Sequence, residues 1–176
     1  METINIILEI IKYTLPSFIV FFTAHTILKQ WKENEEKKGL IELRKQTTQQ
    51  INPLRLQAYE RAVLFLERIS PPNLIMRISK SSVSAGELHT ELLNTIRAEF
   101  EHNLTQQVYM NTASWEALKR GKEETIKLIN ISAAKINASE DAVELSKIIL
   151  ETAMQMEKLP TQLAIDVIKS EVRTLF

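Results

Sequence analysis

The sequence predicts an all-α protein, with an apolar N-terminal helix that continues into a charged helical stalk and then a bundle of about five helices. Three observations lead to this prediction. The 176 residues include only 3 Gly and 5 Pro, whereas strands joined by tight turns need more glycine. Apolar residues recur at helical spacing. Residues that favour helix ends divide the C-terminal two-thirds of the chain. The length suits one domain with a full core.

Charge and cysteine content exclude several classes of function. The chain has 22 basic and 22 acidic residues, so no net positive field attracts it to nucleic acid, and no nucleic-acid partner is expected. It contains no cysteine, which excludes disulfides, thiolate metal sites and a cysteine nucleophile.

The first element is a predicted membrane anchor, residues 1–28. Tyr13 to Leu28 is a run of 16 residues without a formal charge if His25 is neutral. A spanning helix needs about 20 apolar residues, and extending the run back over Glu9 and Lys12 gives 25 residues, 4–28. We therefore expect the chain to contact the lipid bilayer through residues 4–28, with the two charged side chains near the outer interface.

This segment has two other interpretations. A cleaved signal peptide fits poorly, because the first eleven residues hold two acids and no base, whereas signal peptides begin with a basic segment. A helix buried in a soluble core or in a soluble oligomer stays open as an alternative.

The flanking charges predict the orientation of the anchor. Basic residues gather on its C-terminal side, against Lys12 alone on the other: Lys29, Lys32, Lys37, Lys38, Arg44 and Lys45. Under the positive-inside rule the N-terminus lies outside and the C-terminal domain lies in the cytoplasm.

Residues 29–51 predict a solvated helical stalk. Opposite charges recur at helical spacing, as in Lys32 with Glu36 and Glu33 with Lys37. No apolar residue lies between Lys32 and Gly39, so this part has no face to bury, and a coiled-coil seam would need apolar residues every 3.5 positions.

Residues 52–176 predict a cytoplasmic helical bundle domain. Its expected helices begin or end at recognisable caps and prolines, and they cover 53–69, a short segment around 73–78, 85 to about 110, 113–136, 139–159 and 160–175. Ser84 and Glu87 form the pattern of a capping box, and Pro71 and Pro72 end the first of these helices.

Leu64 is a candidate surface contact. In the 53–69 helix the apolar residues share one stripe, but Leu64 falls among the charged residues on the opposite side. A single exposed leucine is common, so contact with a partner at this position is a weaker expectation than simple exposure.

A polar stretch from Glu99 to Gln107 is the one candidate site. At helical spacing Asn103 and Gln107 fall within an apolar stripe, and Glu99 with His102 has the E-x-x-H spacing of di-iron bundles. The candidate polar layer or partner site comprises His89, Glu99, His102, Asn103, Gln106 and Gln107. A hydrogen-bonded layer that fixes helix register is the favoured interpretation. A di-iron site needs a second motif, so no metal, cofactor or catalytic residue is expected.

The segments RLQAYERAVLFLERISPPNLIMRI and RAEFEHNLTQQVYMNTASWEALKRGKEETIKLIN resemble an uncharacterised family of small single-pass membrane proteins from Gram-negative bacteria. The resemblance extends from the apolar N-terminus through the 113–136 helix and fades after about Asn137. It implies a bacterial inner-membrane anchor with a cytoplasmic helical domain, and it implies no activity and no site residues.

The favoured function is a membrane-anchored, non-enzymatic interaction or scaffold protein that holds another membrane or cytoplasmic protein at the cytoplasmic face. Two alternatives remain: a metal-binding or enzymatic bundle that uses the Glu99 and His102 region, and a soluble helical oligomer. The sequence leaves the oligomeric state and the identity of the partner open.

Overall fold

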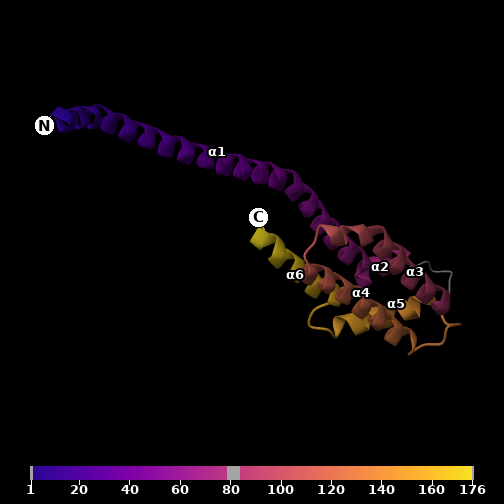
Figure 1. Ribbon diagram of the computed structural model, residues 1–176. Helices are drawn as coiled ribbons and strands as arrows, with labels where there is room; N and C mark the ends of the chain where they lie inside the picture. The colour runs from indigo at the N-terminus through magenta and orange to yellow at the C-terminus, as the bar shows by residue number, and fades with distance from the viewer. Residues whose placement is uncertain (1, 79–83, 176) are drawn as a thin grey trace. The chain divides into compact units, whose positions relative to one another are not determined.

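The structure, a computed structural model, describes residues 2–78 and 84–175, without the side chains of residues 2–5, 7–11, 40, 44 and 48. Within this part of the chain the protein is all-helical, as predicted, and has no strand (Figure 1). The helices are α1 (Glu2–Ile69), α2 (Pro71–Ile78), α3 (Ala85–Asn103), the 3-10 helix η1 (Leu104–Val108), α4 (Thr112–Ala133), α5 (Ala142–Met154) and α6 (Pro160–Leu175).

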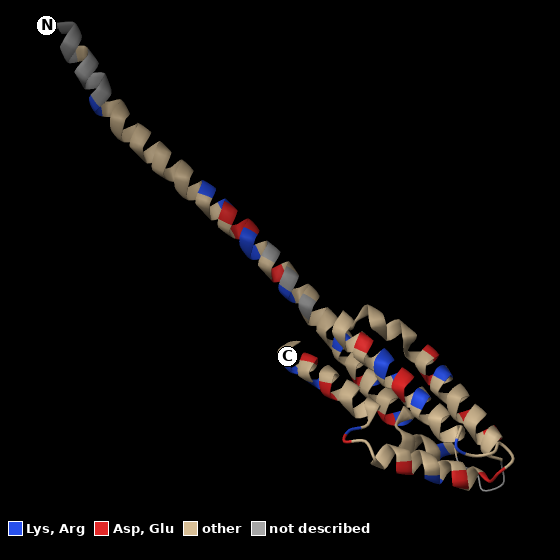
Figure 2. Cartoon of the chain, turned by 90° about the horizontal axis from the view of Figure 1, so that it is seen from below, with Lys and Arg blue, Asp and Glu red and all other residues tan. Residues whose placement is uncertain are grey.

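The chain divides into two compact units, Met1–Ile51 and Asn52–Phe176. The first unit is the N-terminal part of α1, and the predicted stalk, 29–51, is helical. Its described side chains are exposed almost throughout, and Figure 2 shows basic and acidic residues mixed along it. The stalk presents charges of both signs and no buried face, so its helix is not held by packing.

The predicted membrane span lies partly outside the described side chains. Among the residues that the structure does describe, no helix combines the length and the apolar character needed to cross a bilayer. The uncharged run Tyr13–Leu28 has 16 residues, which is fewer than the roughly 20 of a spanning helix. The anchor over 4–28 therefore stays a prediction.

No helix begins at Pro53, contrary to the prediction. Instead α1 continues through Asn52 and Pro53 to Ile69. A proline inside a helix removes one backbone hydrogen bond and crowds the preceding turn. The apolar stripe that follows packs into the core of the second unit, and this packing outweighs the local preference for a helix start.

The core of the second unit is one cluster of apolar side chains contributed by all six of its α-helical segments. Tyr59, Leu66 and Ile69 of α1 are buried as their spacing predicted, and Val63 is partly buried. Phe65 of α1 is also buried, and its ring packs 6.0 Å from that of Phe100, measured between centroids. The unit therefore has the single core expected for a domain of this size.

Helix caps set most boundaries of the bundle. The predicted capping box is present: the Glu87 backbone N–H donates to Ser84 Oγ at 3.3 Å, and the Ser84 N–H donates to the Glu87 carboxylate at 2.9 Å. Asn111 caps α4 by accepting from the Ser114 N–H at 2.7 Å, and Asp141 caps α5 by accepting from Val143 at 2.8 Å. Residues such as these satisfy amide groups that a helix start leaves unpaired.

Three predicted helices are longer than the observed ones. The helix expected to reach about residue 110 ends at Asn103, where the chain continues as η1. The expected 113–136 and 139–159 helices end at Ala133 and Met154. Apolar spacing extends past these ends, but the backbone there already turns toward the next helix, which periodicity alone does not reveal.

A close approach of α4 and α6 is centred on Gly121. A Cβ atom at this position would lie 3.0 Å from the Ala164 Cβ, 3.1 Å from Leu66 Cδ2 and 3.3 Å from the Pro160 carbonyl oxygen. Because Gly121 has no side chain, α6 packs directly on the backbone of α4 at this point. Leu66, in the C-terminal part of α1, packs against the same position.

Candidate functional site

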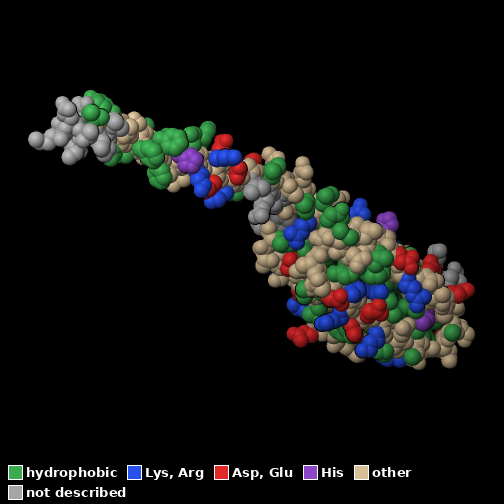
Figure 3. All heavy atoms as spheres, viewed as in Figure 1, with side chains coloured by type: hydrophobic (Ala, Val, Ile, Leu, Met, Phe, Trp, Pro, Cys, Tyr) green, Lys and Arg blue, Asp and Glu red, His purple; other side chains and the backbone are tan. Residues whose placement is uncertain are grey.

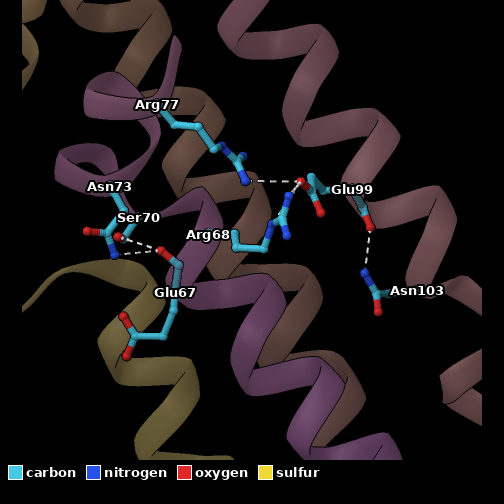
Figure 4. A network of polar contacts seen from close by, with 7 residues as sticks. All are labelled: Glu67, Arg68, Ser70, Asn73, Arg77, Glu99 and Asn103. Carbon is cyan, nitrogen blue, oxygen red and sulfur yellow. Dashed lines mark hydrogen bonds and ion pairs between the residues drawn. The ribbon is translucent and has the colours of Figure 1, made fainter. Parts of the chain in front are cut away.

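Glu99 joins three helices through an ion-pair cluster. Its Oε1 atom lies 2.7 Å from Arg68 Nη2 of α1 and 3.2 Å from Arg77 Nη1 of α2, and Arg68 Nε donates to the same oxygen at 2.9 Å. Figure 4 shows both guanidinium groups directed at the carboxylate. Because the Glu99 side chain is 18% exposed and those of Arg68 and Arg77 are 47% and 34% exposed, water screens the cluster and its contribution is modest.

A second set of hydrogen bonds closes the turn between α1 and α2, next to this cluster (Figure 4). Ser70 Oγ and Asn73 Nδ2 both donate to the Glu67 carbonyl, at 2.8 and 2.9 Å. This carbonyl belongs to the last turn of α1, where carbonyl groups lose their helical partners. The two side chains therefore terminate α1 and fix the start of α2, from which Arg77 reaches Glu99.

Asn103 is buried, as its position on the apolar stripe predicted, but its partner is local. The side chain is 8% exposed, and Nδ2 donates to the Glu99 carbonyl of the same helix at 2.8 Å. It therefore satisfies a carbonyl near the C-terminus of α3 rather than linking α3 to another helix.

The other residues of the predicted polar layer are not brought together. His102 and Gln107 are exposed, and Gln106 is half-buried in η1. Beyond Asn103 the backbone changes from α to 3-10 geometry, so the 3.6-residue period no longer places Gln107 on the face of Ile96 and Phe100.

His89 lies apart from this group, between α3 and α4. It is half-buried, and its Nε2 is 2.8 Å from Asn130 Oδ1. A place in the predicted polar layer requires the His89 ring to point inward. The ring does so only partly, beside a small cavity of about 80 Å³ that Ala133 and Leu145 also line.

The predicted E-x-x-H pair does not form part of a larger group of metal ligands in the described structure. The Glu99 carboxylate faces two arginines, and His102 faces outward. Throughout residues 2–78 and 84–175, no three His, Cys, Asp or Glu side chains described there gather closely enough to hold a metal ion.

Leu64 lies on a groove that sequence reasoning did not find. The groove runs between α1 and α6 and has a volume of about 610 Å³. The apolar residues that line it are Leu56, Tyr59, Val63 and Leu64 of α1 and Ile168 and Val172 of α6. We call this the α1/α6 groove. The helical spacing placed Leu64 on the charged side of its helix, which indicated an exposed leucine. Nothing in the sequence indicated that α6 would lie beside it.

The two rims of the α1/α6 groove carry opposite charges. Glu60 and Glu67 line it on the α1 side, and Lys169 and Arg173 line it on the α6 side. All four are exposed. An apolar groove with an acidic and a basic rim is suited to protein contact, because the apolar residues provide area to bury and the charges provide orientation.

Comparisons with known proteins give one result. No match to the chain is found among curated proteins or among solved structures. A family described as a family of unknown function (DUF7935) matches residues 5–175, which is nearly the full length and agrees with the expectation of an uncharacterised family. The chain therefore belongs to the DUF7935 family of unknown function.

Proposed function

We propose that this protein is a membrane-anchored, non-enzymatic interaction protein that presents the helical unit 52–176 at the cytoplasmic face of a bacterial inner membrane. The observation that carries the proposal is the exposed apolar surface of the N-terminal helix. Phe18, Ile19, Val20, Phe21 and Phe22 are each at least 56% exposed, and hydrophobic side chains are visible along this part of the chain in Figure 3.

These five residues are consecutive, which argues for lipid rather than a partner helix. Successive residues of an α-helix are about 100° apart, so five in a row point to every side of it. A partner helix or a coiled coil covers one stripe, whereas lipid surrounds a helix completely. A helix that is apolar on all sides is buried in a large core or in a membrane.

Three hydroxyl groups in this segment are hydrogen-bonded within the helix itself. Ser17, Thr23 and Thr26 donate their hydroxyl groups to backbone carbonyls four residues earlier, at 3.1, 2.9 and 3.0 Å. Internal hydrogen bonding of this kind lowers the cost of placing hydroxyl groups in hydrocarbon.

Aromatic residues lie at both ends of the apolar segment. Tyr13 and Trp31 are 74% and 64% exposed, and their separation of 18 residues corresponds to about 27 Å of helix. The hydrocarbon core is about 30 Å thick, and Tyr and Trp favour its two interfaces. The basic residues that follow Leu28 favour the cytoplasmic side, which gives the orientation with the N-terminus outside.

The interaction role rests on the surface of the second unit. The α1/α6 groove is an apolar surface with charged rims. A surface of this kind suits a module that binds protein.

Substitution by lysine within the apolar segment tests the anchor. We expect the full chain to stay in the membrane fraction after alkaline carbonate washing, and Val20→Lys/Phe21→Lys to release it, because each lysine at the centre of a span costs about 2.5–3.5 kcal/mol. Ile41→Lys/Leu43→Lys, in the exposed stalk, is the matched control and should remain in the membrane. Release of the parent chain by carbonate would contradict the proposal.

A reporter fused after Phe176 tests the orientation. A fluorescent protein that matures only in the cytoplasm should be bright, and alkaline phosphatase, which is active only outside, should be inactive. The opposite pair of results would place the helical unit on the outer side and overturn the proposed location.

A further inference from the structure

We propose that the α1/α6 groove is the contact surface of a symmetric homodimer, in which α1 of each copy packs against α6 of the other. The surface is apolar and uncovered: Leu64 and Leu56 are 56% and 38% exposed. Leu64 also lies among charged residues on the surface of α1.

The charges on the rims identify a second copy as the occupant. Glu60 and Glu67 lie on the α1 side, and Lys169 and Arg173 lie on the α6 side. A twofold axis parallel to the two helices exchanges the sides, so that each acidic rim faces the basic rim of the other copy. Isologous contacts require such a self-complementary surface.

These four side chains have their charge available for a partner. None of them is in an ion pair with another side chain in the described part of the chain. Lys169 lies near Asp166 and contributes to lowering the pKa of that carboxyl, after the hydrogen bonds from Gln162 and Lys158. Facing a carboxylate across the interface would neutralise the remaining charge of each rim.

The direction of the axis also fits a chain that is tethered at its N-terminus. Within the second unit, Figures 1 and 2 show α6 running back toward the end at which α1 enters. An axis parallel to these helices places the Asn52 ends of both copies at the same end of the dimer. The dimer does not depend on the anchor, but two copies in one membrane could form it.

The size of the groove predicts a reversible dimer. Ten residues line it, whereas a standard stable interface uses about 20–30 residues a side. We therefore expect association that depends on protein concentration rather than a permanent dimer.

Reversing the charges on one rim of the groove at a time provides the test. We compare the parent chain, full length in detergent, with Glu60→Lys/Glu67→Lys and with Lys169→Glu/Arg173→Glu, and measure molar mass by light scattering after size-exclusion chromatography. The parent should approach dimer mass as concentration rises. Each variant alone should stay monomeric, because like charges then face each other, and an equimolar mixture of the two variants should form a mixed dimer.

The mixture separates this proposal from its competitors. A parent that stays monomeric at every concentration contradicts the homodimer. A mixture that fails to associate, with both variants correctly folded by circular dichroism, points to a different protein as the occupant and also contradicts it. Variants that dimerise like the parent contradict it as well, since the association would then not depend on the charged rims of the groove. None of these results affects carbonate resistance, so failure here is distinct from failure of the anchor.

Crosslinking gives a second readout that does not depend on charge. The chain has no cysteine, so a single introduced thiol reports one position. Leu64→Cys should be joined into a covalent dimer by a short bis-maleimide. Met154→Cys should not be, although Met154, the last residue of α5, is 84% exposed. Equal crosslinking at both positions, or crosslinking at Met154→Cys alone, would contradict the proposed surface.

Discussion

At the scale of single residues, Glu99 has the clearest structural role. Its carboxylate faces Arg68 and Arg77 and ties α3 to α1 and α2. Half-exposed ion pairs contribute little individually, but two cations on one carboxylate form a network whose centre can be removed by one substitution. Removing that centre would also leave two arginines facing each other without a counter-charge.

We therefore expect Glu99→Ala to lower the free energy of unfolding by about 1 kcal/mol at low salt, within the range for exposed or partly exposed ion pairs. The difference should shrink at high salt, because salt screens charges that water can reach. Urea denaturation at two salt concentrations measures this. Glu101→Ala, on the exposed side of the same helix, is the control and should have little effect. A loss that does not depend on salt would show that packing, not charge, is responsible.

Glu87 gives a prediction that depends on pH. Hydrogen bonds from the Ser84 backbone N–H and the Ser84 hydroxyl, in that order of effect, hold the pKa of Glu87 below its ordinary value of 4.5. Because the pKa is lowered in the folded state, the carboxylate stabilises the fold above pH 4.5 and loses this contribution as the pH falls through the lowered value.

The difference in stability between the parent and Glu87→Gln should therefore depend on pH. The parent should be more stable at pH 7, and the two should converge in acid once Glu87 is protonated. Ser84→Ala should move the pKa of Glu87 back toward 4.5, as measured by NMR titration. A stability difference that is the same at pH 7 and pH 3 would contradict the capping explanation.

Asn103 and Glu99 show what the sequence could reveal at this scale. The burial of Asn103 followed from its helical spacing after Ile96 and Phe100, which places it on the same apolar face. Its partner could not be predicted, because a carboxamide can bond either to another helix or to its own backbone. The partners of Glu99 are 31 and 22 residues away, on elements whose arrangement is set by packing.

At the scale of elements, local signals predicted helix starts better than helix ends. The predicted capping box is encoded by two residues only three positions apart, Ser84 and Glu87, and it is present. The end of α3 at Asn103 and the passage of α1 through Pro53 are decided by packing in the second unit, which overrides local preference. Gly121 on α4 is another feature that local sequence does not reveal, since its role depends on the packing of α6.

Gly121→Val should lower the free energy of unfolding by about 1–3 kcal/mol, the usual cost of overpacking a core. The new side chain would meet Ala164, Leu66 and the Pro160 carbonyl, and backbone cannot move aside as a side chain can. Lys127→Val, at an exposed position of the same helix, is the matched control and should cost only a few tenths of a kcal/mol in helix propensity. Equal effects of the two substitutions in chemical denaturation would contradict the close contact.

At the scale of the whole molecule, the division at residues 51 and 52 organises the chain. The second unit has one apolar cluster and its own helix caps, whereas the described side chains of the first unit are almost all exposed. A helix that packs on nothing needs another environment or a large set of local interactions. The sequence predicted this division from composition, but it could not predict the α1/α6 groove, which depends on the arrangement of the helices.

Residues 52–176 should therefore fold alone. We expect this fragment to be monomeric or weakly dimeric, strongly helical by circular dichroism and cooperative in urea denaturation, because its core and caps lie within it. A fragment that begins at Ala58 and lacks Leu56 should fold as well, since the core on α1 starts at Ala58. Aggregation or low helicity of the 52–176 fragment would show that the first unit is needed for folding.

The central claim is that residues 1–51 tether a protein-binding unit to a membrane. The most direct test compares the membrane association of the full chain with that of residues 52–176 in cells. The full chain and residues 52–176 are expressed in a bacterial host, and membranes are separated by flotation and washed with alkaline carbonate. We predict that the full chain floats with lipid and resists the wash, while the fragment stays in the soluble fraction. A full chain found in the soluble fraction, or a fragment that floats as the full chain does, would contradict the claim.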